Sequence, residues 1–240
     1  MYKTLLLLIL VSGISLYSCA KEREIPDEVK PDVRTEDVNK EEKTPDGTAG
    51  NESKSPDGIK NLKYGISTIP SSLKEYKGKP VMGASWEDGN GENVIVITET
   101  EVTEKPGGIG TQLSKELYGY HYIMNGDEAE ELWKIQDFVK ECEFDLTLEY
   151  LPESLTITDL NDNGIAESTF LYRLTCKSDV SPDDMKLMMH EGKNKYALRG
   201  YNEVTGIGGD YTVDKAFNDA PDSFLDYAKK EWEKFKVFEY

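Results

Sequence analysis

Short segments rich in aromatic and β-branched residues follow one another from Leu62 to Tyr201, and turn-forming residues separate them. Several of these segments alternate apolar and polar side chains, which is the pattern of a half-buried strand. The turn Asp88-Gly89-Asn90-Gly91 separates two of them, and Glu191-Gly192-Lys193-Asn194 separates another two as a hairpin. The pattern predicts strands over residues 81–86, 93–100, 117–124, 132–139, 144–150, 155–158, 168–174, 185–190 and 196–201.

The tail from Asp219 onward changes period. Phe224, Ala228, Trp232 and Phe235 recur at spacings of four and three residues, which places them on one face of a helix. The chain is therefore predicted to be mainly β, in the α+β class, with a C-terminal amphipathic helix. We expect its strands to form an antiparallel β meander, arranged either as a sandwich or as a propeller-like fold.

The N-terminal residues have the layout of a secretory signal peptide, predicted over residues 1–18. Lys3 precedes an apolar run that begins at Leu5, and small residues then lead to Cys19. The segment Leu16-Tyr17-Ser18-Cys19 resembles a lipobox, in which cleavage precedes a cysteine that receives the lipid. An ordinary signal peptide with an incidental cysteine is the alternative. Lipidation of Cys19 would hold the protein on a membrane by acyl chains such as palmitate.

The residues after Cys19 indicate a location and a tether. The charged run Lys21-Glu22-Arg23-Glu24 is similar to the surface-export signals of Bacteroidota lipoproteins, which favours the outer membrane, on its periplasmic or cell-surface face. Residues 19–60 are charged, rich in Pro, Asp and Lys, and nearly free of aromatic residues. Such a composition cannot bury enough apolar surface to fold, so we expect a disordered tether. Residues 61–240 then form a single β-rich globular domain.

The formal net charge of −18 argues against nucleic acid as a partner, because the chain would repel phosphates. The cysteines fit an oxidising compartment. With Cys19 lipidated, only Cys142 and Cys176 remain, and each lies near the end of a predicted strand. We expect them to form a disulfide bond, with two buried free thiols as the alternative.

The segment 158–167 carries the pattern most typical of a binding site. Asp159, Asn161 and Asn163 supply oxygen side chains at every second position, Gly164 follows, Ile165 offers a backbone carbonyl, and Glu167 closes the loop. Ca²⁺ prefers six to eight hard oxygen ligands, so this spacing predicts a structural calcium site. An Asx-rich turn without metal is the alternative.

This segment differs from an EF-hand, since Phe170 stands where the bidentate glutamate would be and the flanking segments are predicted strands. It resembles instead the calcium loops between strands in extracellular repeats of the FG-GAP and VCBS type. The resemblance covers about twenty residues around the loop. It implies a site that ties one loop rather than a catalytic centre.

A longer stretch, residues 132–200, resembles a Bacteroidota lipoprotein family associated with surface polysaccharide biosynthesis. The segments that carry the resemblance are Trp133-Lys134-Ile135-Gln136-Asp137-Phe138, Phe144-Asp145-Leu146-Thr147, the loop from Asp159 to Gly164, Ser178-Asp179-Val180-Ser181-Pro182 and Met189-His190-Glu191-Gly192. The resemblance implies an outer-surface protein connected with polysaccharide. It supplies no catalytic residues.

Three classes of function remain. A binding or assembly module is favoured, because Tyr118, Tyr120 and Tyr122 share one strand face, and aromatic faces stack on sugars or pack at interfaces. The same face could instead lie under the C-terminal helix. A carboxylate-based polysaccharide-processing enzyme would draw on the acidic residues Asp137, Glu141, Asp145 and Glu149. A purely structural envelope lipoprotein is the third interpretation. His121 and His190 lack neighbours with catalytic spacing, so we expect structural roles for both.

Overall fold

The computed structural model describes residues 58–108 and 110–238, which belong to one compact unit. Within these residues the strands form two six-stranded sheets and a small two-stranded ribbon. Residue 109, Cys19, the predicted signal peptide and the predicted tether up to residue 57 lie outside the described residues. Ile59 is buried, and the first strand begins at Lys60.

The first sheet contains the strands up to Cys142, with the order β1-β2-β3-β5 and with β6 on the other side of β5. Its members are β1 (Lys60–Tyr64), β2 (Lys79–Asp88), β3 (Gly91–Glu99), β4 (Thr103–Pro106), β5 (Thr111–Asn125) and β6 (Glu128–Cys142). A 3₁₀ turn, η1 (Ile66–Thr68), follows β1. All pairings in this sheet are antiparallel, as the predicted meander requires.

The second sheet has the order β14-β11-β10-β9-β7, with β8 also beside β9. Its members are β7 (Asp145–Tyr150), β8 (Thr156–Thr158), β9 (Glu167–Lys177), β10 (Asp184–Glu191), β11 (Asn194–Tyr201) and β14 (Tyr211–Val213). The ribbon of β12 (Glu203–Val204) and β13 (Ile207–Gly208) and the 3₁₀ helix η2 (Lys215–Asp219) lie before α1 (Asp222–Phe235). The predicted hairpin over 185–201 is confirmed, with Glu191 paired to Asn194.

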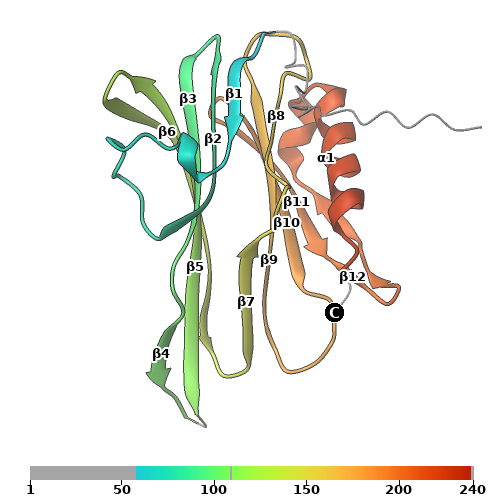
Figure 1. Cartoon of the computed structure of the whole chain (residues 1–240). Coiled ribbons are helices and arrows are strands. Elements are labelled where there is room, and N and C mark those ends of the chain that lie inside the picture. The colour runs from blue at the N-terminus through green and yellow to red at the C-terminus, as the bar shows by residue number, and fades with distance from the viewer. Residues whose placement is uncertain (1–57, 109, 239–240) are drawn as a thin grey trace, which may run out of the picture. The chain divides into compact units, whose positions relative to one another are not determined.

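The two sheets pack face to face, so the sandwich rather than the propeller-like arrangement is found. Figure 1 shows the first sheet, the second sheet and α1 as successive layers. Ile95 and Ile97 from the first sheet share one apolar core with Leu148 and Phe170 from the second. The alternate residues of β3, Val94 and Val96, are buried on the outer face, so both faces of this strand are covered. Near-continuous apolar sequence is what such a strand requires.

The C-terminal helix covers the outer face of the second sheet, as its periodicity predicts. Phe224, Ala228 and Trp232 are fully buried against apolar side chains of β9, β10 and β11, among them Leu187 and Leu198. The helix begins at Asp222 after Pro221, whose fixed φ suits a helix start. Neither Asp219 nor Asp222 caps it, since the first turn has no side-chain cap.

Candidate functional site

The predicted calcium loop joins β8 to β9, at the end of the second sheet where β9 begins. Asp159 follows the last residue of β8 and Glu167 is the first residue of β9. Asp162 and Gly164 both have φ in the left-handed region, at 54° and 78°, which folds the short segment back on itself. Asp162 is exposed, whereas Asp159 is buried.

Backbone amides of the loop point at the predicted ligand side chains. Asp159 Oδ1 accepts from the Asn163 amide at 3.1 Å, and Asp159 Oδ2 accepts from Gly164 at 2.9 Å. Asn161 Oδ1 accepts from Asn163 at 3.2 Å, and Asn163 Oδ1 accepts from Ile165 at 2.8 Å. Each side-chain oxygen has a further lone pair, so these bonds shape the loop and leave acceptor capacity for a cation.

Glu167 is fully buried and only half satisfied. Its Oε2 accepts from Thr158 Oγ1 at 3.0 Å and from the Leu160 amide at 2.9 Å, whereas its Oε1 has no hydrogen-bond partner among the described residues. Burial raises the pKa of this carboxyl to about 7, against the lowering effect of the Leu160 amide. A buried charge without a counterion is unfavourable, so an ionised Glu167 calls for a cation beside it.

A second carboxylate, Glu191, lies directly opposite Glu167 in the pairing of β9 with β10. Its Oε1 accepts from Asn161 Nδ2 at 2.8 Å and from Asn163 Nδ2 at 2.7 Å, and its charge further raises the pKa of Glu167. Two like charges in direct cross-strand register repel each other. The sequence pattern missed Glu191 because its place beside the loop follows from the β9–β10 register.

These residues form an oxygen-rich cluster. Among the residues that the structure describes, no three His, Cys, Asp or Glu side chains stand close enough to hold a metal by themselves. An ion here would therefore depend on amide and carbonyl oxygens of Asn161, Asn163 and Ile165 together with Asp159 and Glu167. Ca²⁺ accepts such mixed oxygen ligands, unlike metals that need histidine or thiolate.

The loop also contacts the first sheet. The Gly89 amide, in the turn between β2 and β3, donates to the Gly164 carbonyl at 2.7 Å. Asp88 Oδ2 accepts from the Ala166 amide at 3.0 Å and from the indole of Trp86 at 2.9 Å. A Cβ at Gly89 would stand only 2.9 Å from the Gly164 oxygen, so this approach requires glycine. The loop thus ties the two sheets together at this end.

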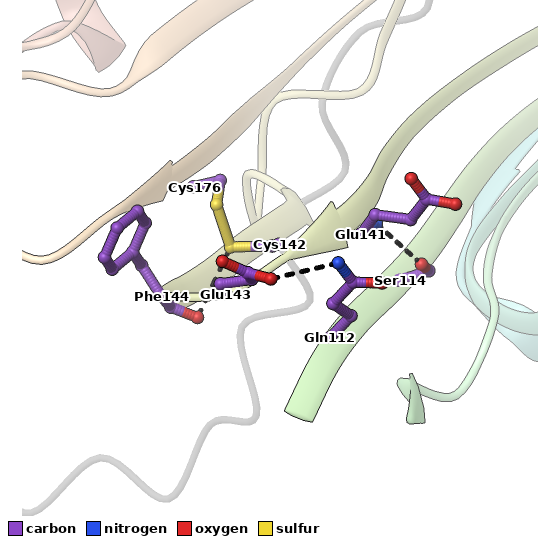
Figure 2. The surroundings of a disulfide bond; sticks show 7 residues. All are labelled: Gln112, Ser114, Glu141, Cys142, Glu143, Phe144 and Cys176. Atoms are coloured by element: carbon purple, nitrogen blue, oxygen red, sulfur yellow. Dashed lines mark hydrogen bonds between the residues drawn. A yellow bond between two sulfur atoms is a disulfide. The ribbon is translucent and has the colours of Figure 1, made fainter. Parts of the chain in front are cut away.

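The predicted disulfide is confirmed: Cys142 and Cys176 are bonded, with 5.6 Å between their Cα atoms. The bond joins the end of β6 to β9, and so links the two sheets (Figure 2). Beside it, Gln112 Nε2 donates to Glu143 Oε1 at 3.1 Å and the Glu141 amide donates to Ser114 Oγ at 3.0 Å. The covalent link and the calcium loop lie at opposite ends of β9.

The tyrosine stripe is not an exposed surface, which corrects the sugar-stacking interpretation. Tyr118, Tyr120 and Tyr122 are at most 2 % exposed, with successive ring centroids 5.8 and 6.0 Å apart. They pack beneath the segment 69–77, where the Lys77 amide donates to the Tyr120 hydroxyl at 3.0 Å. The covering element is therefore this loop and not the C-terminal helix, which lies on the other sheet.

Both histidines are buried in the core between the sheets. Asn93 Nδ2 donates to Asp88 and Gly91, so its Oδ1 faces His121 and accepts from His121 Nε2 at 2.9 Å. Burial lowers the pKa of His121 to about 4, opposed by the charge of Asp88. The ring of His190 stacks on Trp133 with centroids 4.0 Å apart. Burial and then the neighbouring His121 lower its pKa to about 3.

The carboxylates considered for catalysis are engaged with separate partners. Asp137 accepts from the Tyr172 hydroxyl at 2.9 Å and from Lys186. Glu149 pairs with Arg173 at 2.7 Å. Each of these two carboxylates is therefore paired with a basic side chain of the second sheet.

A pocket of about 460 Å³ opens between the sheets at the side where β6 forms the edge. Strand β6 lines it with Trp133, Ile135 and Asp137, and the second sheet lines it mainly with basic side chains of β10 and β11. The sequence places Lys186 and Arg199 in two predicted strands and Lys193 and Lys195 between those strands, with no pattern that indicates a shared cavity.

In comparisons with known proteins, no family model, no curated protein and no solved structure matches the chain. The resemblances to a Bacteroidota lipoprotein family and to FG-GAP-type loops therefore remain predictions. Among the described residues, no helix is long and apolar enough to cross a membrane.

Proposed function

We propose that this chain is a lipid-anchored protein of the bacterial outer membrane whose β-sandwich is a binding or assembly module stabilised by Ca²⁺. The anchor rests on the lipobox-like sequence before Cys19, and the link to surface polysaccharide rests on the resemblance over residues 132–200. The calcium-binding part rests on the loop, which supplies several oxygen side chains and ends at the buried carboxylate of Glu167.

The observation that carries the proposal is the pairing of Glu167 with Glu191 beside the loop. One buried oxygen of Glu167 has no partner, and the second carboxylate lies directly across the strand pair. A divalent cation would offset this repulsion and satisfy the free oxygen. Extracellular calcium sites with few carboxylates have dissociation constants of about 10⁻⁴ to 10⁻³ M, which suits millimolar calcium outside the cell.

Thermal unfolding of the full chain in neutral detergent micelles tests the calcium proposal. We expect about 5 mM Ca²⁺ to add about 1–2 kcal/mol relative to EDTA, which raises the melting temperature by roughly 3–8 °C. Asp159→Asn removes a ligand charge and should abolish the rise. Asp162→Asn is the matched control, because Asp162 is exposed in the same loop. An equal midpoint in calcium and in EDTA would refute the proposal.

The anchor has its own test. Cells grown with labelled palmitate should incorporate the label into the wild-type chain and not into a Cys19→Ala variant. Label that persists in the variant would contradict the lipid anchor while leaving the calcium proposal intact.

A further inference from the structure

The pocket between the sheets is concave, partly apolar and basic, and these properties point to a ligand. Its lining includes the apolar side chains of Met188 and Ile135 and the basic side chains of Lys186, Lys193, Lys195 and Arg199. Lys134 also borders it, but the Lys134 ammonium lies over the rings of Tyr118 and Tyr120 on the outer face of the first sheet.

Strand register places Lys186, Lys195 and Arg199 on the inner face of the second sheet, and Lys193 lies in the turn between β10 and β11. Lys186 is the direct cross-strand partner of Arg199, and Lys195 is the partner of His190. Side chains in direct register stand about 5 Å apart at Cβ, so the Lys186 and Arg199 side chains lie close together. A sandwich interior normally carries apolar side chains at such positions. Basic side chains on this inner face are therefore not required by packing of the core.

Two of the four cations are neutralised within the protein and two are not. Lys186 pairs with Asp137, and Arg199 Nη1 pairs with Asp214 at 3.1 Å. Lys193 and Lys195 form no ion pair with any residue that the structure describes. Four cations against two carboxylates leave a net charge of +2 at this pocket, in a chain whose net charge is −18.

We propose that this pocket binds a small ligand through an oxyanion, a carboxylate or a phosphate, carried on a body of sugar size. Arginine and lysine are the side chains that recognise such groups, through charge-assisted hydrogen bonds. The volume of about 460 Å³ far exceeds the roughly 30 Å³ of one water and falls in the range of small-molecule sites. A bare oxyanion would leave most of it unfilled, so the ligand must extend beyond its charged group.

This inference deepens the proposed function, since it rests on the domain being a binding module and names the class of its ligand. It depends neither on calcium nor on the lipid anchor. Lys193 and Lys195 allow a clean test, because both are exposed and unpaired, and their replacement leaves no buried carboxylate alone.

Isothermal titration calorimetry on the full chain in neutral detergent, with calcium present, tests the inference. The probes are D-glucuronate for a carboxylate, D-glucose 6-phosphate for a phosphate, and D-glucose as the neutral control. We expect at least one of the two anionic probes to bind, more weakly at higher salt, and D-glucose not to bind. The Lys193→Gln/Lys195→Gln variant should bind that probe about tenfold more weakly or worse.

The matched control is Lys60→Gln/Lys230→Gln, which makes the same change in net charge at exposed lysines away from the pocket. It should keep the wild-type affinity. The inference is overturned if neither anionic probe binds, if the pocket variant binds as tightly as wild type, or if the control loses as much affinity. Binding of D-glucose that the pocket variant retains would overturn the oxyanion site and leave the binding module standing.

Discussion

At the scale of single residues, the interior of this sandwich contains polar groups whose state depends on their surroundings. His121 has one ring nitrogen hydrogen-bonded to Asn93, and its other ring nitrogen, Nδ1, is buried with no hydrogen-bond partner in residues 58–108 and 110–238. A proton on Nδ1 would place a charge against Trp86 and Trp133, whose rings contact the imidazole. The neutral ring is therefore the form that the folded state stabilises.

His121 predicts a specific loss of stability in acid. The folded-state pKa of about 4 lies below the ordinary value of 6.5, so the unfolded chain takes up a proton that the folded chain does not. The stabilisation from the neutral His121 ring is complete above pH 6.5 and is lost as the pH falls toward 4. Below pH 4 this loss in the free energy of unfolding reaches about 3 kcal/mol.

Urea unfolding at a series of pH values measures this effect. His121→Gln keeps a donor for Asn93 and does not titrate, so its free energy of unfolding should fall less than that of wild type between pH 6.5 and 4.5. Because all other groups are common to both proteins, the difference between the two curves isolates His121. If the free energies of unfolding of wild type and His121→Gln fell equally between pH 6.5 and 4.5, His121 would not be held neutral in the folded state.

At the scale of elements, the sequence predicts strands well where one face is buried and poorly where neither is. The alternation in the region that became β5 and β6 is clear, although both strands extend further than predicted. Strands β1 and β4 escaped prediction because their side chains are mostly exposed and polar, so they carry little periodic signal. Tertiary pairing with β2 and β5 determines them instead.

The C-terminal helix offers a direct test at this scale. Trp232 is fully buried, and its indole donates to the Gly209 carbonyl at 3.0 Å. Trp232→Ala should lower the free energy of unfolding by about 3–5 kcal/mol, since it removes a large buried side chain. Lys230→Ala, on the exposed face, should change it by less than about 0.5 kcal/mol. Equal effects in urea unfolding would show that the helix does not dock as described.

At the scale of the whole described domain, two links hold the sheets together at opposite ends of β9. The sequence predicted both local elements. An oxidising compartment predicted the disulfide between Cys142 and Cys176, and the spacing of Asp159, Asn161 and Asn163 predicted the loop. It did not predict that each connects different sheets. That property, like the position of Glu191 and the basic pocket, arises only when strands distant in sequence are brought together.

The disulfide should add substantially to global stability. It closes a loop with a sequence separation of 34 residues, for which chain entropy gives about 4 kcal/mol. The double variant Cys142→Ser/Cys176→Ser should therefore lose about 3–4 kcal/mol in urea unfolding, and wild type in reductant should lose as much. A loss below about 1 kcal/mol would mean that the link between the sheets adds little.

The calcium loop carries the central claim, and equilibrium dialysis of the full chain against radioactive Ca²⁺ tests it most directly. The account predicts one ion bound per chain at millimolar calcium, loss of that ion in Asp159→Asn, and retention in Asp162→Asn. Absence of bound calcium in the wild-type chain, or equal binding by Asp159→Asn, would contradict it.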